Sequence, residues 1–120
     1  MQSRNDTYVM ELAIQYIRRN YPKPITLAMV SNEVSLNYAY FSTMFSKYTG
    51  KTFSEYLRNT RMEKAKELLR QPDISIAEVA AQVGYENYKS FYRAFKDAVG
   101  TTPVEYQQKK YRIHREDEKQ

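Results

Sequence analysis

Apolar residues recur at intervals of three and four along most of the chain, a spacing that predicts helices. The first predicted helix covers residues 8–20. Its inward stripe consists of Val9, Leu12, Ala13, Tyr16 and Ile17. Pro22 and Pro24 follow at once, and proline cannot continue a helix. The polar residues 1–7 have no apolar stripe, so we expect a flexible N-terminus before this helix.

A short helix and then a longer one are predicted next. Thr26 is a good N-cap for a helix that runs through Val34, with its apolar residues inward. After a turn at Ser35, Asn37 is the expected cap of a helix from residue 38 to 48. The apolar face of that helix carries Phe41, Met44, Phe45 and Tyr48, and the opposite face carries Ala39, Ser42, Thr43 and Ser46.

The same arrangement is predicted again between residues 76 and 99. A short apolar helix ends at Gly84, and Asn87 is placed to cap the helix that follows. This second helix has an apolar face of Phe91, Phe95, Ala98 and Val99, and an outer face of Lys89, Tyr92, Arg93 and Lys96. A short helix that shows cations and hydrogen-bonding groups outward is typical of insertion into the major groove of DNA. An amphipathic helix with a merely solvated outer face is the alternative.

A residue-by-residue comparison shows that the two arrangements are copies of one unit. Ile25, Ala28, Val30 and Val34 stand 49 positions before Ile74, Ala77, Val79 and Val83. The turn of the second copy contains one extra residue, so the offset after it is 50 positions. At this offset the identical residues are Asn37, Tyr38, Phe41, Phe45, Gly50, Thr52, Glu55 and Tyr56 in the first copy, and Asn87, Tyr88, Phe91, Phe95, Gly100, Thr102, Glu105 and Tyr106 in the second. These twelve identities predict a duplicated helix-turn-helix.

A long helix is predicted between the two copies, because residues 53–70 contain neither glycine nor proline. Eighteen helical residues would rise about 27 Å. Successive major-groove faces on one side of DNA lie about 34 Å apart, so a helix of this length is suited to hold two reading helices on one duplex. We interpret most of its cations as solvated surface. After it, Thr102 and Pro103 begin a last helix that we expect to reach residue 110, before a polar tail at 111–120 that holds the lone His114.

Composition narrows the class of protein. Three glycines and four prolines in 120 residues favour an all-α fold. A net charge of +5 favours polyanionic partners, although many unrelated proteins are as basic. The lack of cysteine excludes disulfides, thiolate metal sites and thiol nucleophiles, and no apolar run is long enough to cross a membrane. The absence of cysteine fits a reducing compartment, so the expected location is the cytoplasm. We find no nucleophile–base pair, glycine-rich phosphate loop or metal-ligand cluster, so we expect no enzyme, no cofactor and no metal.

With the duplicated unit in view, the chain resembles the DNA-binding domain of the AraC/XylS family of bacterial transcriptional regulators. The resemblance is carried by T-L-A-M-V-S-N-E-V-S-L-N at 26–37, F-S-E-Y-L-R-N-T-R-M-E-K-A-K-E-L-L at 53–69, I-A-E-V-A-A-Q-V-G-Y at 76–85 and F-Y-R-A-F-K-D-A-V-G-T-T-P-V-E-Y at 91–106. It implies seven helices in two homeodomain-like subdomains, at 8–51 and 72–110, joined by a linker helix at 52–71. It also implies that the two units bind double-stranded DNA in adjacent major grooves.

The resemblance also assigns roles by position. The residues implied to face bases are Ala39, Ser42, Thr43 and Ser46 in the first recognition helix, and Lys89, Tyr92, Arg93 and Lys96 in the second. Arg93 is suited to pair with a guanine, while Lys89 and Lys96 are suited to phosphates. The helix N-termini at Asn37 and Asn87 offer backbone amides to phosphates.

Two departures from the family pattern are visible. Ser35 stands where the family often has glycine, which predicts strain if the turn needs a left-handed backbone. The first recognition face also lacks any arginine or lysine, so the first unit is expected to read DNA more weakly, through thymine methyl groups or close hydroxyl contacts.

The resemblance leaves the wider context as an expectation. We expect the output domain of a larger regulator that activates transcription by placing a surface against RNA polymerase. The isolated domain is expected to be monomeric and the full regulator dimeric. The alternative is a helical module for protein–protein interaction that reads no DNA sequence, and the small residues of the first outer face leave this alternative open for the first unit.

Overall fold

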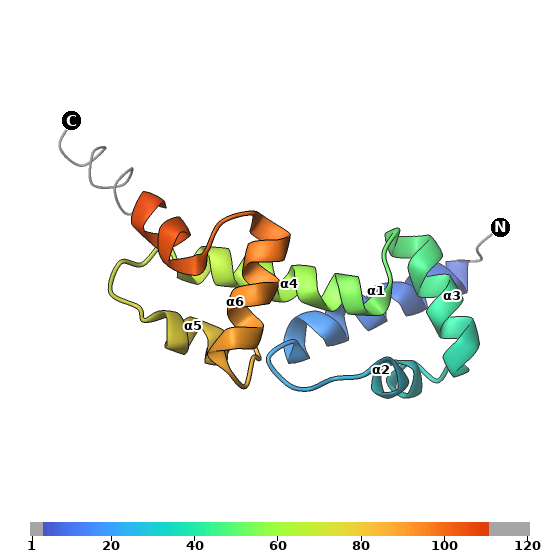
Figure 1. Ribbon diagram of the computed structural model, residues 1–120. Coiled ribbons are helices and arrows are strands. Elements are labelled where there is room, and N and C mark those ends of the chain that lie inside the picture. Colours follow the sequence, from blue (N-terminus) through green and yellow to red (C-terminus); the bar gives the residue numbers. More distant parts are fainter. Residues whose placement is uncertain (1–3, 111–120) are drawn as a thin grey trace. The chain divides into compact units, whose positions relative to one another are not determined.

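The computed structural model describes residues 4–110; residues 1–3 and 111–120, including the predicted polar tail and His114, lie outside the described residues. Its helices are α1 (Arg4–Asn20), α2 (Leu27–Glu33), α3 (Tyr38–Thr49), α4 (Phe53–Leu68), α5 (Ile76–Gln82) and α6 (Tyr88–Val99) (Figure 1). A seventh helical segment occupies 103–110. The described part of the chain contains no strand, so the predicted all-α fold with seven helices is confirmed.

The described part of the chain divides into two compact units, and the boundary between Thr60 and Arg61 falls inside α4. The predicted linker helix is therefore shared: its N-terminal half packs in the first unit and its C-terminal half in the second. Phe53 and Leu57 are buried on the first half, and Met62 and Ala65 on the second.

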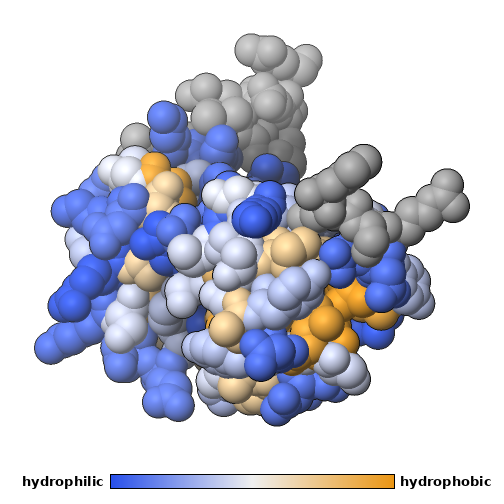
Figure 2. All heavy atoms as spheres, turned by 90° about the vertical axis from the view of Figure 1, so that its right-hand side faces the viewer, coloured by the Kyte–Doolittle hydropathy of each residue, from blue (hydrophilic) through white to orange (hydrophobic). Residues whose placement is uncertain are grey.

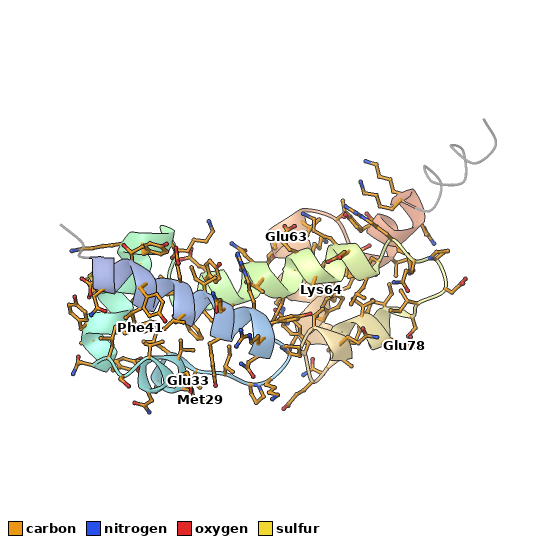
Figure 3. The ribbon with its side chains drawn as sticks, turned by 180° about the vertical axis from the view of Figure 1, so that it is seen from behind. Met29, Glu33, Phe41, Glu63, Lys64 and Glu78 are labelled. Atoms are coloured by element: carbon orange, nitrogen blue, oxygen red, sulfur yellow. The ribbon has the colours of Figure 1, made fainter. Side chains whose placement is uncertain are left out.

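The core of the first unit lies where α1, α2 and α3 meet the start of α4. Its buried members are Met10, Ala13, Ile17, Ile25, Val30, Phe41, Met44, Phe45, Phe53 and Leu57. Phe45 is at the centre of an aromatic group, with its ring 5.5 Å from that of Phe41 and 5.3 Å from that of Tyr56. Phe41 points from α3 toward α1 in Figure 3. Truncating either phenylalanine to alanine would cost about 3–5 kcal/mol.

The second unit repeats this packing with its own residues. Its fully or nearly fully buried side chains are Met62, Ala65, Leu69, Val79, Ala80, Val83, Phe91, Phe95 and Pro103. The ring of Phe95 lies 5.8 Å from that of Phe91 and 5.6 Å from that of Tyr106. The rings of Phe95 and Tyr106 meet at 75°, close to the 81° between Phe45 and Tyr56. The duplication read from the sequence is therefore a duplication of local structure.

Side-chain caps fix where the short helices begin. The Thr26 hydroxyl accepts a hydrogen bond from the Met29 amide at 3.2 Å, and the Ser75 hydroxyl accepts one from the Glu78 amide at 3.1 Å. Such caps contribute about 1 kcal/mol each, because they satisfy amides that have no partner inside the helix. Met29 and Glu78 occupy the same position of the repeat and project outward from α2 and α5 (Figure 3).

The last helix is tied to the loop before α5 by Gln107. Its side-chain Nε2 donates to the carbonyl oxygens of Gln71 and Ile74, at 2.9 and 2.8 Å. One amide thus satisfies two loop carbonyls. No local sequence pattern predicts this contact, because it joins residues more than thirty positions apart.

Four local predictions were wrong. The first helix begins at Arg4 rather than residue 8, since Asp6 is favourable in a first helical turn and also accepts a hydrogen bond from Tyr40. Leu12 was expected inward but is 37% exposed, beside a surface hollow between α1 and the end of α2. Ala98 was expected on the apolar face of α6 and is exposed. The long helix ends at Leu68, two residues early, in a turn closed by a bond from the Gln71 amide to the Leu68 carbonyl.

Candidate nucleic-acid interface

The outer faces of α3 and α6 project from the two units as the periodicity predicted. On α6, Lys89, Arg93 and Lys96 are exposed and Tyr92 is half-buried. On α3, Ala39 and Thr43 are exposed and Ser42 and Ser46 are half-buried. Each set occupies the side of its helix opposite the buried phenylalanine pair. The positions pair off at the 50-residue offset, so the two faces are equivalent surfaces with different chemistry.

The cations of α6 are unengaged within the described part of the chain. Lys89, Arg93 and Lys96 make no ion pair or hydrogen bond to any described residue. Together with Tyr88, Tyr92 and Asp97 they line one open depression along the helix. The tyrosine rings lie 6.0 Å apart at an angle of 45°. By contrast, Lys64 and Lys66 of α4 pair with Glu67 and Glu63, as expected for solvated surface. Figure 3 labels Glu63 and Lys64 on this helix.

The α3 face is small and uncharged, and its helix is held by two tyrosine hydroxyls. The Tyr40 hydroxyl donates to the Asp6 carboxylate, with both oxygens at 3.2 Å. The Tyr48 hydroxyl donates to Glu11 at 3.5 Å. Desolvation and the adjacent Asp6 carboxylate raise the pKa of Tyr40, because both disfavour a phenolate. These two hydrogen bonds hold both ends of α3 against α1.

The view of this end of the first unit in Figure 2 shows mostly hydrophilic side chains interrupted by smaller apolar areas. Among the exposed large hydrophobic residues of the first unit are Met29, Tyr38 and Tyr40.

The turns that precede α3 and α6 have equivalent hydrogen bonds in the two units. The Leu36 amide donates to the Ser31 carbonyl at 2.9 Å, and the Tyr85 amide donates to the Ala80 carbonyl at 2.9 Å. This Schellman arrangement requires a left-handed residue just after the helix. Gly84 meets the requirement with φ 102°, but Ser35 meets it with φ 58°. The strain that the sequence predicted at Ser35 is therefore present in the backbone.

In the second unit, the turn is also supported by Arg61 of α4. Its guanidinium lies 5.6 Å from the centre of the Tyr85 ring and interacts with the phenol. Burial lowers the pKa of Arg61, and the Tyr85 phenol partly opposes that shift. The interpretation of most cations of this helix as solvated surface did not single out Arg61, since no local pattern marks a contact between residues 24 apart.

Caps at the start of α3 and α6 determine which backbone amides remain available. Asn37 Oδ1 accepts from the amides of Ala39 and Tyr40, at 3.0 and 3.2 Å. Asn87 Oδ1 accepts from the Ser90 amide at 2.8 Å. Both asparagines are caps, as predicted. Within the described residues, the first amide of each helix, at residues 38 and 88, is left without a partner.

Comparison with known proteins shows which family has this architecture. A family model described as "Helix-turn-helix domain" matches residues 30–109. The regulatory protein PocR of Salmonella typhimurium is 34% identical over 99 residues, which are 82% of this chain and 33% of PocR. The xylose operon regulatory protein of Escherichia coli is 32% identical over 105 residues, 88% of this chain and 26% of that protein. The chain belongs to the AraC/XylS family. It spans a third or less of the length of these two relatives.

Solved structures agree with the assignment. The C-terminal domain of AraT, a response regulator from Geobacillus stearothermophilus, superposes with a TM-score of 0.81 at 34% identity and covers 84% of each chain. The DNA-binding domain of AdpA, solved in complex with a target DNA, superposes with a TM-score of 0.81 over 88% of this chain and 95% of that domain. At 21% identity, the second likeness shows the shared fold.

None of the helices within residues 4–110 is long and apolar enough to cross a membrane. No group of three or more histidine and acidic side chains in the same range is arranged to hold a metal ion.

Proposed function

We propose that this AraC/XylS-family domain binds double-stranded DNA by inserting α3 and α6 into successive major grooves, and that it regulates transcription, most directly by activation. The observation that carries the proposal is the outer face of α6. There Lys89, Arg93 and Lys96 are exposed and have no anionic partner among the described residues. A protein that releases counterions from phosphates needs cations in this free state.

The α6 side chains have separable roles in this proposal. Arg93, at the middle of the face, is suited to donate both arms to O6 and N7 of a guanine, which gives about 1–3 kcal/mol of discrimination. Lys89 and Lys96 flank it along the helix and are suited to the phosphates. Tyr92 fills the space between them and packs against Tyr88.

The α3 side chains are suited to a different kind of readout. Ala39 and the Thr43 methyl group can pack against thymine methyl groups, and the hydroxyls of Ser42 and Ser46 can bond to base edges at close range. Small side chains give few directional contacts. We therefore assign stronger sequence discrimination to the second unit.

The experiment is binding selection from a random duplex library, read by sequencing, with the wild-type chain and two variants. Wild type should enrich a motif with two blocks about one helical turn apart. Arg93→Ala should relax preference at one position of one block, whereas Lys96→Ala should weaken binding to all sequences and lower the salt slope by about 1.

Equal losses for Arg93→Ala on specific and random DNA would contradict its base-reading role. Binding without any motif, or no binding, would contradict the proposal and favour a protein-interaction module. We further propose that the domain acts in the cytoplasm as the output part of a longer regulator, dimeric as a whole, that contacts RNA polymerase. It is proposed to use no cofactor and to catalyse no reaction.

A further inference from the structure

We propose that Tyr38 and Tyr88 are paired phosphate contacts, which position the two recognition helices on the DNA backbone without reading sequence. The inference rests on the proposed DNA binding and adds two residues to the interface. Neither residue belongs to the outer faces predicted from the sequence.

The first support is the pattern of identities within the repeat. Most identical pairs have a structural reason: Phe41 and Phe91 are buried, Asn37 and Asn87 are caps, and the glycines at 50 and 100 are left-handed. Tyr38 and Tyr88 share no such reason, because their side chains are 56% and 42% exposed. The ring contact between Tyr88 and Tyr92 has no counterpart in the first unit, where Ser42 takes the place of Tyr92. All four outer-face positions next to them differ between the copies. Residues that stay identical while the base-facing residues differ are expected to contact a part of DNA that does not vary with base sequence. That part is the phosphate backbone.

The second support is the state of the two hydroxyls. Tyr40 and Tyr48, on the same helix as Tyr38, both donate to carboxylates of α1. The hydroxyls of Tyr38 and Tyr88 donate to no described residue. Each is therefore a free neutral donor on the surface, as a phosphate contact requires.

The third support is position. Each tyrosine is the first residue of its recognition helix, and side chains there lean back past the helix N-terminus. The same two residues carry the first-turn amides that the asparagine caps leave unpartnered. A phosphate near either helix start would thus meet an amide and a hydroxyl of one residue. The positive end of the helix dipole adds to the attraction.

The test compares Tyr38→Phe, Tyr88→Phe and the double variant with wild type on the selected duplex and on a random duplex, across a salt series. Phenylalanine keeps the ring and removes only the hydroxyl. Each single change should weaken binding about tenfold on both duplexes, as expected for the loss of a hydrogen bond to a charged group. The salt slope should stay unchanged, because a neutral donor releases no counterion. Tyr8→Phe, which removes the hydroxyl of an exposed tyrosine of α1, is the matched control and should bind like wild type.

Duplexes with one neutral methylphosphonate in place of a phosphate identify the partner. For each tyrosine, a methylphosphonate at one position of the duplex should lower the affinity of wild type. The same methylphosphonate should not lower the affinity of the corresponding phenylalanine variant any further. The inference would be overturned if both single variants bound with wild-type affinity, or if either variant selected a different motif. It would also be overturned if, at every methylphosphonate position, the affinity loss from the modified phosphate added to the loss from the phenylalanine substitution. Failure of wild type to bind any duplex would instead overturn the proposed function together with this inference.

Discussion

Replacing Ser35 by glycine should stabilise the first unit. Ser35 is held at φ 58°, in the left-handed position that closes the Schellman turn after α2. A side chain in that conformation costs about 1–2 kcal/mol, because Cβ approaches the following carbonyl oxygen. Glycine avoids this cost but loses roughly 0.5–1 kcal/mol more backbone entropy on folding. The expected net gain in the free energy of unfolding is therefore about 0.5–1 kcal/mol.

Thermal and urea denaturation followed by circular dichroism measure this gain. For a chain of this size we expect the midpoint to rise by about 2–5 °C. Ser35→Ala keeps Cβ and is the matched control, so it should gain nothing. The reverse change, Gly84→Ala, places Cβ at φ 102° and should destabilise the second unit by about 1 kcal/mol or more.

Amide hydrogen exchange then locates the effect, since the two units need not unfold together. Protection should increase in α2 and α3 for Ser35→Gly, and decrease in α5 and α6 for Gly84→Ala. If Ser35→Gly were no more stable than Ser35→Ala, the strain argument would be refuted, because relief of the Cβ contact would then contribute nothing.

Three further changes test other contacts. Met29→Glu should stabilise α2 by about 0.5–1 kcal/mol, because it completes a capping box with Thr26 like that available to Glu78. Urea denaturation would detect this gain, and an unchanged midpoint would show that the capping box does not form. Asp6→Asn should loosen the start of α3 and weaken protection of its first turn in hydrogen exchange, whereas unaltered protection would mean that the bond to Tyr40 is not held in solution. Gln107→Ala should lower the free energy of unfolding by about 1–2 kcal/mol in urea denaturation, because two loop carbonyls lose their donor. The control Gln108→Ala, at the exposed neighbouring position, should leave it unchanged.

The sequence was most informative where local chemistry decides the structure. Thr26, Asn37 and Asn87 were identified as caps because a cap depends on one side chain and the amides within three residues. The repeat reinforced those predictions by presenting each feature twice. The outward direction of the α3 and α6 faces followed from helical period alone.

Long-range contacts were not predictable in the same way. Tyr40 donates a hydrogen bond to Asp6 in the first turn of α1, which begins at Arg4, and nothing near either residue in the sequence signals this pairing. Periodicity marked Leu12 as apolar but could not show that its part of α1 borders a surface hollow instead of the core. The sequence likewise does not distinguish Arg61 from the solvated cations of the long helix, because its contact with Tyr85 exists only once the second unit has folded.

The central claim is that the outer faces of α3 and α6 are equivalent reading surfaces, and exchanging one face tests it most directly. Ala39→Lys, Ser42→Tyr, Thr43→Arg and Ser46→Lys together give α3 the outer face of α6. Binding selection with this variant should enrich two copies of the block that wild type reads through Arg93, about one helical turn apart. An unchanged first block would contradict the account, because α3 would then not be the element that reads it.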